Sequence, residues 1–283
     1  MKRAMTILVI TFLFSVTSPT WATEESPSLY NNPAKMQAAS TEAETNLLGD
    51  NFSLTIGLKS WHAALSLDYH KGKPESAANM FGPAVNMTLL EKFYAGMSYY
   101  TGSDFKFETT ESVYDGYTDT SKIKHTKSDF DIWAGYQFHP RGSIFIGYKT
   151  STIDSKAESD LPGEDVLTDN YYDLDFKGPV IGISGNYPIS NSGFILFGTL
   201  GCAFLDVTKK IPETAGSFGG EITEKGRGPA LEFGLAYTFR ELPRLSLMAG
   251  YKYQKYNTSG DKINKDGELY TLSGLTLGVN YRF

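Results

Sequence analysis

The sequence predicts an all-β fold: a transmembrane antiparallel up-and-down β-barrel of about ten strands, with eight or twelve strands as alternatives. Three observations predict it. Apolar and small or polar side chains alternate along strand-length segments, long polar breaks alternate with short ones, and the last segment keeps its alternation up to Phe283. Alternating faces suit a wall with lipid on one side and a polar lumen on the other.

Residues 1–22 are predicted to be a secretory signal peptide. Lys2 and Arg3 precede an apolar run from Ala4 to Val16, and small residues fit cleavage after Ala22. This is the three-part pattern of such a peptide. The apolar run is too short for a membrane anchor, which needs about 20 residues.

Composition narrows the function classes. The net charge is −6 with no strongly basic cluster, which argues against a nucleic-acid partner. Cys202 is the only cysteine in the sequence, so a disulfide scaffold and a cysteine-based zinc site are excluded. A mean hydropathy of −0.27 fits a membrane barrel, because about half of its wall faces water.

The breaks define the strand order. Long breaks are expected at residues 70–81, 109–127, 151–170, 208–227 and 257–268, and short ones at 90–92, 139–142, 189–192 and 240–244. Three of the short breaks contain or adjoin turn formers, such as Pro140, Gly193 and Pro243. Long external loops and short turns on the other side are the plan of a membrane barrel.

The faces of the segments favour a membrane barrel over a soluble one. Four segments show the apolar face clearly: Phe130, Ile132, Ala134, Tyr136 and Phe138; Leu231, Phe233, Leu235, Tyr237 and Phe239; Leu245, Leu247, Ala249, Tyr251 and Tyr253; and Phe52, Leu54, Ile56 and Leu58. The opposite faces are rich in small residues, which suit a crowded lumen. In the first segment the apolar phase changes at Trp61, which we interpret as a β-bulge.

The last segment has a distinctive apolar face, formed by Leu275, Leu277, Val279, Tyr281 and Phe283. It resembles the C-terminal assembly signal of bacterial outer-membrane β-barrel proteins, which ends in an aromatic residue. The resemblance covers residues 51–283 and implies a place in the bacterial outer membrane and recognition by the barrel-assembly machinery. No motif assigns a subfamily.

Three regions are therefore expected: the signal peptide at 1–22, an N-terminal periplasmic tail or lumen plug at 23–50, and the barrel at 51–283. The middle region is poor in β-branched residues, and 33–48 could form a short helix because Ala and Glu favour one. We favour a tail over a plug.

A polar cluster is predicted in the lumen. Its members are Asp129, Asp131, Asp173, Asp175, Glu232 and Lys252, and the acids are expected to pair with Lys59, Lys149, Lys177 or Lys252. Polar side chains are expected in such a lumen. Alternatively, the acids and His125 or His70 could activate water, in partial resemblance to the aspartate–histidine site of omptin proteases. We favour the structural interpretation, with no catalytic residues, metal or cofactor.

The expected function is that of a non-enzymatic barrel that stabilises the envelope or binds external ligands through its loops. One alternative is a narrow channel for small or apolar solutes, because the segment 194–204 is apolar on both faces. A wide porin is not expected. The interior of a barrel of about eight strands is filled by side chains, and a barrel of ten strands is only slightly wider. A second alternative is a hydrolase at the barrel rim. Expected partners are outer-membrane lipid and lipopolysaccharide, whose phosphates the basic run 122–127 could contact.

Overall fold

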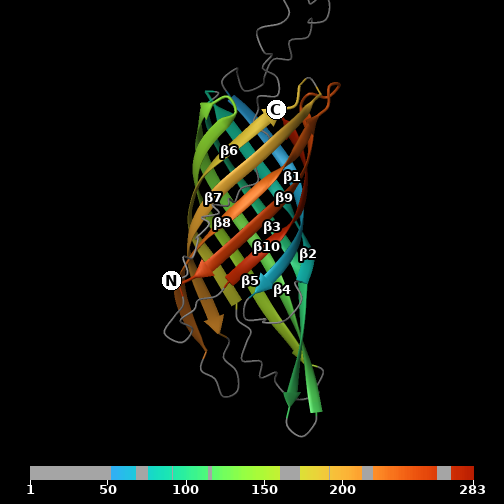
Figure 1. The fold of residues 1–283 in the computed structure, drawn as a ribbon, viewed down its shortest axis with the longest axis vertical. Coiled ribbons are helices and arrows are strands. Elements are labelled where there is room, and N and C mark those ends of the chain that lie inside the picture. The colour runs from blue at the N-terminus through green and yellow to red at the C-terminus, as the bar shows by residue number, and fades with distance from the viewer. Residues whose placement is uncertain are drawn as a thin grey trace, which may run out of the picture.

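The computed structural model describes residues 52–67, 76–90, 92–113, 117–159, 173–190, 192–211, 219–259 and 269–283. These residues form a closed barrel of ten antiparallel strands (Figure 1). The strands are β1 (Phe52–Leu67), β2 (Ser76–Leu89), β3 (Phe93–Val113), β4 (Tyr117–His139), β5 (Gly142–Ser159), β6 (Asp173–Pro188), β7 (Phe194–Ile211), β8 (Gly220–Thr238), β9 (Leu245–Thr258) and β10 (Leu269–Arg282). The predicted fold class and strand number are confirmed. Among the described residues, no helix is long and apolar enough to cross a membrane.

The last strand closes the barrel against the first. Ile56 on β1 lies opposite Tyr281 on β10, and Leu58 lies opposite Val279. At the end of the chain, the backbone N–H of Phe283 donates a hydrogen bond of 2.8 Å to the carbonyl of Leu54. The alternating C-terminal segment therefore completes the circle of hydrogen bonds, which leaves the sheet without an edge.

Short turns connect the strands at the end of the barrel where the chain terminates (Figure 1). Leu90 and Ser190 adopt left-handed backbone conformations there, with φ of 50° and 46°, and Gly193 has φ of 81°. A Cβ atom at Gly193 would lie 2.8 Å from the carbonyl oxygen of Thr238, so this turn requires glycine.

The strands at the opposite end are longer than the sequence predicted. The expected breaks at 70–81, 109–127, 151–170 and 208–227 are wrong over much of their length, because ladder pairing continues through polar residues. In the β3–β4 hairpin, pairing extends to Val113 opposite Tyr117. This hairpin reaches furthest at that end (green in Figure 1). Serine, threonine and lysine indicated loops in the sequence. They are equally compatible with a strand whose outer face contacts water.

A belt of exposed apolar side chains surrounds the end with the short turns. It includes Ile56, Leu58, Phe81, Phe93, Met97, Tyr99, Phe130, Ile132, Tyr136, Phe138, Ile144, Ile146, Tyr148, Ile181, Ile183, Phe204, Phe233, Leu235, Leu247, Leu275, Leu277, Val279, Tyr281 and Phe283. Such an apolar band with aromatic residues is the lipid-facing surface of a membrane barrel. The end with the longer strands is therefore the extracellular end, in keeping with the long-loop side of such barrels.

Beyond the belt the pattern is inverted, and apolar side chains face the lumen. Trp61, Ala63, Leu65 and Leu67 on β1 are buried, whereas Leu58 is exposed. The pairing of β1 with both neighbours is continuous, so the predicted β-bulge is wrong. The apolar residues change face because the solvent outside changes from lipid to water, not because the backbone is irregular.

Apolar side chains fill the extracellular part of the lumen. The fully buried members include Phe105, Ile123, Ile153, Leu174, Phe176 and Val207. A smaller cluster of Ile195, Phe197, Ala236 and Met248 lies nearer the short turns. The extracellular half is thus organised like a soluble β-barrel, with its core inside.

Candidate functional site

The central feature of the lumen is a layer of charged side chains. It consists of Lys59, Lys127, Asp129, Asp131, Lys149, Glu232 and Lys252, each at most 4% exposed. On β4 this layer lies between two buried apolar residues, Ile123 on the extracellular side and Trp133 on the periplasmic side. Charges at this depth are stable only when they are paired and hydrogen-bonded.

Part of the layer is a continuous chain of ion pairs. Lys149 Nζ lies 3.3 Å from Asp129 Oδ2 and 3.2 Å from Asp131 Oδ1. Lys127 Nζ lies 2.6 Å from the other oxygen of Asp129 and donates a hydrogen bond to Ser151. Two carboxylates thus alternate with two ammonium groups on β4 and β5, which compensates their burial.

Lys252 belongs to a second part of the layer. It lies opposite Glu232 in the β8–β9 register. Its Nζ atom is 4.5 Å from the ring centre of Trp61 and 4.7 Å from that of Tyr100, which gives two cation–π contacts. Among the atoms that the structure describes, the ammonium groups of Lys252 and Lys59 have no hydrogen-bond acceptor.

The predicted polar cluster is brought together only in part. Asp129, Asp131, Glu232 and Lys252 lie in the lumen, together with the predicted partners Lys59 and Lys149. Asp173 and Asp175 lie on the outer face of β6, because Leu174 and Phe176 occupy its buried face. Their predicted inward orientation is wrong, since the rule that polar residues face the lumen applies only at the level of the lipid belt.

Asp175 forms an ion-pair cluster on this outer face, on the extracellular side of the belt. Its Oδ2 atom lies 2.9 Å from Lys210 Nζ and 3.4 Å from Lys177 Nζ. Partial burial raises the pKa of Asp175, but the hydrogen bond from Lys210 and the charge of Lys177 outweigh it, and the net pKa is lowered. The hydrogen bond to Asp175 and its negative charge raise the pKa of Lys210.

A serine and a histidine meet near the extracellular end of the lumen. His125 Nδ1 lies 2.8 Å from Ser155 Oγ, and the backbone N–H of Ser155 donates to Asp173. Both side chains are buried, and the His125 ring packs edge-on against Phe107. The pair contains a hydroxyl and a base, but Asp173 bonds to the serine backbone rather than to the histidine. This arrangement therefore differs from a Ser–His–Asp triad.

The other histidines that the structure describes lie elsewhere. His62 is exposed on β1 and bonds to Asn79 through Nδ1, and His139 accepts a backbone hydrogen bond in the β4–β5 turn. Within the described ranges, no three His, Cys, Asp or Glu side chains gather closely enough to hold a metal ion.

The partial resemblance to omptin proteases left out one motif of the sequence. Asp68, Tyr69 and His70 form an Asp-x-His sequence directly after the extracellular end of β1. These three residues and the region 23–50 lie outside the described residues. The signal that identifies it is an acidic residue two positions before a histidine, Asp68 before His70.

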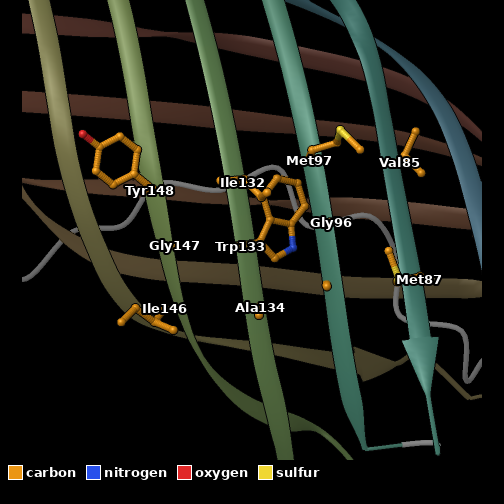
Figure 2. A pocket seen from close by; sticks show the side chains of 11 residues that line it. Val85, Met87, Gly96, Met97, Ile132, Trp133, Ala134, Ile146, Gly147 and Tyr148 are labelled. Atoms are coloured by element: carbon orange, nitrogen blue, oxygen red, sulfur yellow. The ribbon is translucent and has the colours of Figure 1, made fainter.

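The outer face carries a hollow in the lipid belt. Figure 2 shows Ala134 on β4 between Ile146 on β5 and Met87 on β2, with Met97 and Ile132 further along the strands. The hollow has a volume of about 410 Å³ and an almost entirely apolar lining. It exists because Ala95 and Ala134, which are opposite each other in the register, have short side chains between longer ones.

The chain is similar to solved structures of other bacterial outer-membrane proteins. Among solved structures, the outer membrane protease OmpT from Escherichia coli has a TM-score of 0.51 at 16% identity, covering 83% of this chain and 97% of that chain. The translocator domain of the autotransporter NalP from Neisseria meningitidis has a TM-score of 0.45 at 11% identity, covering 84% and 91%. No curated protein sequence matches.

At such identities the likeness to OmpT shows the fold alone. The family model described as the outer membrane protein beta-barrel domain, however, matches residues 76–283, which is most of the chain. The chain therefore belongs to the outer membrane protein beta-barrel domain family, and its place is the bacterial outer membrane.

Proposed function

We propose that this protein is a non-enzymatic outer-membrane barrel with a closed lumen, which presents its extracellular strands and loops to partners. The observation that carries the proposal is the filling of the lumen. The charged layer lies between apolar side chains on both sides along the strands, and the large side chains of Trp61, Tyr100, Phe105 and Phe176 are at most 2% exposed.

A filled lumen argues against an aqueous channel. A ten-stranded barrel is close to the size at which side chains fill the interior. Solutes would have to pass both the ion pairs around Asp129 and the aromatic contacts of Phe176, whose ring lies 5.1 Å from that of Tyr270 and 5.8 Å from that of Tyr256. The interior thus has the composition of a core rather than a pore.

The extracellular extension supports a role in surface interaction. β3 and β4 have 21 and 23 residues, and their hairpin extends beyond the neighbouring strands (Figure 1). Lys106 on β3 and Thr126 on β4 are exposed, as is Asp154 on the adjacent β5. A rigid barrel that holds polar strands and loops outside the membrane is a suitable support for binding segments.

The closed lumen can be tested by electrical recording. The protein, folded in detergent and inserted into a planar lipid bilayer, is expected to give no discrete current steps. A matched variant, Phe105→Ala with Phe176→Ala, widens the extracellular lumen, and any conductance of this variant would show that insertion succeeded. Discrete steps from the unchanged protein would contradict the proposal.

A second candidate function is that of an outer-membrane protease, which one observation favours. Asp68-x-His70 follows the extracellular end of β1, in a ten-stranded barrel whose fold is like that of the OmpT protease. A general base within reach of a bound peptide could activate water for hydrolysis. Cleavage of a fluorogenic peptide library that Asp68→Asn and His70→Ala abolish, and His62→Ala preserves, would support it. A library that stays intact with the unchanged protein rejects it.

A further inference from the structure

The charged layer of the lumen holds more positive than negative groups. Its four lysines face three carboxylates, which leaves one ammonium group without a counter-charge. The other inward charges among the described side chains do not correct this difference. Lys209 and Glu224 form their own ion pair at 2.7 Å, and Arg282, at the periplasmic end of β10, is positive. A buried charge without a partner is costly, so the layer favours an additional anion.

The excess charge is located in one part of the layer. The chain of ion pairs on β4 and β5 contains two lysines and two aspartates, so its charges cancel. The remaining members are Lys59, Lys252 and Glu232, two cations and one anion, each at most 4% exposed. Leu58, the neighbour of Lys59, belongs to the exposed apolar belt, so lipid rather than water lies outside at this level. One positive charge is therefore held between a lipid wall and a buried interior.

The same part of the lumen contains donors without acceptors. Among the described residues, no acceptor bonds to the ammonium groups of Lys59 and Lys252, the indole N–H of Trp61 or the amide nitrogen of Gln254. These four donors come from two short segments, one on β1 and one on β9, and all four side chains are buried. Glu232 Oε2 and Asp131 Oδ2 likewise lack a donor, but the charges of both carboxylates are already counted. The donor set is that of an anion site.

The periplasmic half of the lumen offers an approach without negative charge. Between the layer and the short turns, the buried inward residues Thr55, Ser143, Ser246 and Asn280 are polar and uncharged. No inward side chain that the structure describes in this half carries a carboxylate. The extracellular half is instead filled by apolar side chains and contains Glu224. An anion from the periplasm therefore meets hydroxyl and amide groups and then the lysines.

We propose that the lumen binds one small monovalent anion, such as chloride, beside the ammonium groups of Lys59 and Lys252. The anion balances the charge of the layer and thereby stabilises the closed barrel. Its size is limited because Trp61 and Tyr100 are completely or almost completely buried beside Lys252. The acidic residues of the region 23–50 are another source of negative charge, and the experiments below distinguish the two sources.

The dependence of stability on chloride tests the site. The protein, folded in detergent, is unfolded by urea at constant ionic strength while chloride is replaced by gluconate, an anion too large for the site. Chloride at ten times its Kd is expected to lower the unfolding equilibrium constant about tenfold, and the effect should saturate no faster than one site allows. Equal stability of the unchanged protein in the two salts would overturn the proposal.

Two lysine variants locate the effect. Lys59→Met and Lys252→Met each remove the excess positive charge and are expected to abolish the dependence on chloride. Lys225→Met changes a lysine that is 80% exposed on the outer face and is the control, which should keep the dependence. Heat-modifiable gel migration reports whether each variant folds. Chloride dependence that persists in both folded lysine variants would overturn the assignment.

A third variant changes the charge in the opposite direction. Glu232→Gln keeps the size of the side chain and removes the carboxylate nearest in the register to Lys252, so chloride affinity is expected to rise several-fold. A merely structural role of Glu232 would not tighten chloride binding. This measurement decides the proposal even if the lysine variants do not fold, since unchanged or weaker affinity would contradict it.

The position and the source of the anion are tested separately. In crystals grown with bromide, anomalous diffraction is expected to show one peak inside the barrel beside Lys59 and Lys252. Bromide found only on the outer surface would overturn the proposal. Deletion of residues 23–50 is expected to leave the chloride dependence unchanged. A chloride dependence that appears only after this deletion would show that an acidic side chain of that region occupies the site, which would also overturn the proposal.

Discussion

Lys252 points its ammonium group at the face of the Trp61 ring, 4.5 Å from the ring centre, inside the barrel. Both side chains are completely buried, and Tyr100 contributes a second ring to the same cation. The contact joins β1 to β9 across the intervening β10. It therefore links the charged layer to the apolar filling of the extracellular lumen.

This contact predicts a measurable coupling. A double-mutant cycle with Trp61→Leu and Lys252→Met is expected to give a coupling free energy of about 1–2 kcal/mol, because a desolvated cation–π pair is stronger than an exposed one. The free energy of unfolding would be measured by urea titration in lipid vesicles. Trp61→Phe with Lys252→Met is the control, since Phe keeps an aromatic face. Additive effects in the Trp61→Leu cycle would show that the contact is incidental.

The ion pairs around Lys149 predict an unusual order of stabilities. Lys149→Met leaves the carboxylates of Asp129 and Asp131 buried without their shared partner, and the expected loss is about 3–5 kcal/mol. Adding Asp129→Asn and Asp131→Asn removes the uncompensated charges and is expected to recover part of the loss. A triple variant less stable than Lys149→Met alone would contradict this account.

The sequence predicted the barrel well because its pattern depends on local alternation. The faces of Phe130, Ile132, Leu275 and Leu277 followed directly from period-two spacing, and the structure confirms them as exposed belt residues. The number of strands followed from the turns, because glycine and proline favour turns through their own local backbone conformations.

The errors have one common physical cause. Polar residues were assigned to the lumen or to loops, which is correct only where lipid surrounds the barrel. Outside the belt, water replaces lipid, and Asp173 and Asp175 face outward while Trp61 faces inward. The level of this boundary along the barrel depends on how the ten strands are aligned with one another. The pattern of a single strand does not contain that information.

The ion pair between Asp175 and Lys210 predicts a specific pH dependence. The pKa of Asp175 is lowered, so its stabilisation is present above its unfolded pKa and is lost as the pH falls through the folded value. The pKa of Lys210 is raised, so its stabilisation is present below its unfolded pKa and is lost as the pH rises through the folded value.

The stability difference between the unchanged protein and Lys210→Met should therefore be constant between about pH 5 and 9. It should shrink below about pH 4 and above about pH 10.5. Because the Lys210 side chain is 46% exposed, this stability difference should be under about 1 kcal/mol. Unfolding by urea across this pH range measures it, with Lys225→Met as a second exposed ion pair for comparison. A difference that peaks below pH 4 would contradict the assignment.

The C-terminal strand predicts a separation of assembly from stability. Leu275, Leu277 and Phe283 expose their side chains on the lipid face of β10, while the backbone N–H of Phe283 bonds to Leu54. Phe283→Ala keeps that backbone bond and removes only the exposed ring, which packs edge-on against Tyr281. If the insertion machinery recognises this face, Phe283→Ala should reduce the folded protein in the outer membrane several-fold. The yield of refolding in detergent should change little.

The matched control is Phe233→Ala, which changes an exposed belt residue on β8 and should assemble normally. Equal outer-membrane levels of the two variants would reject a signal role for Phe283.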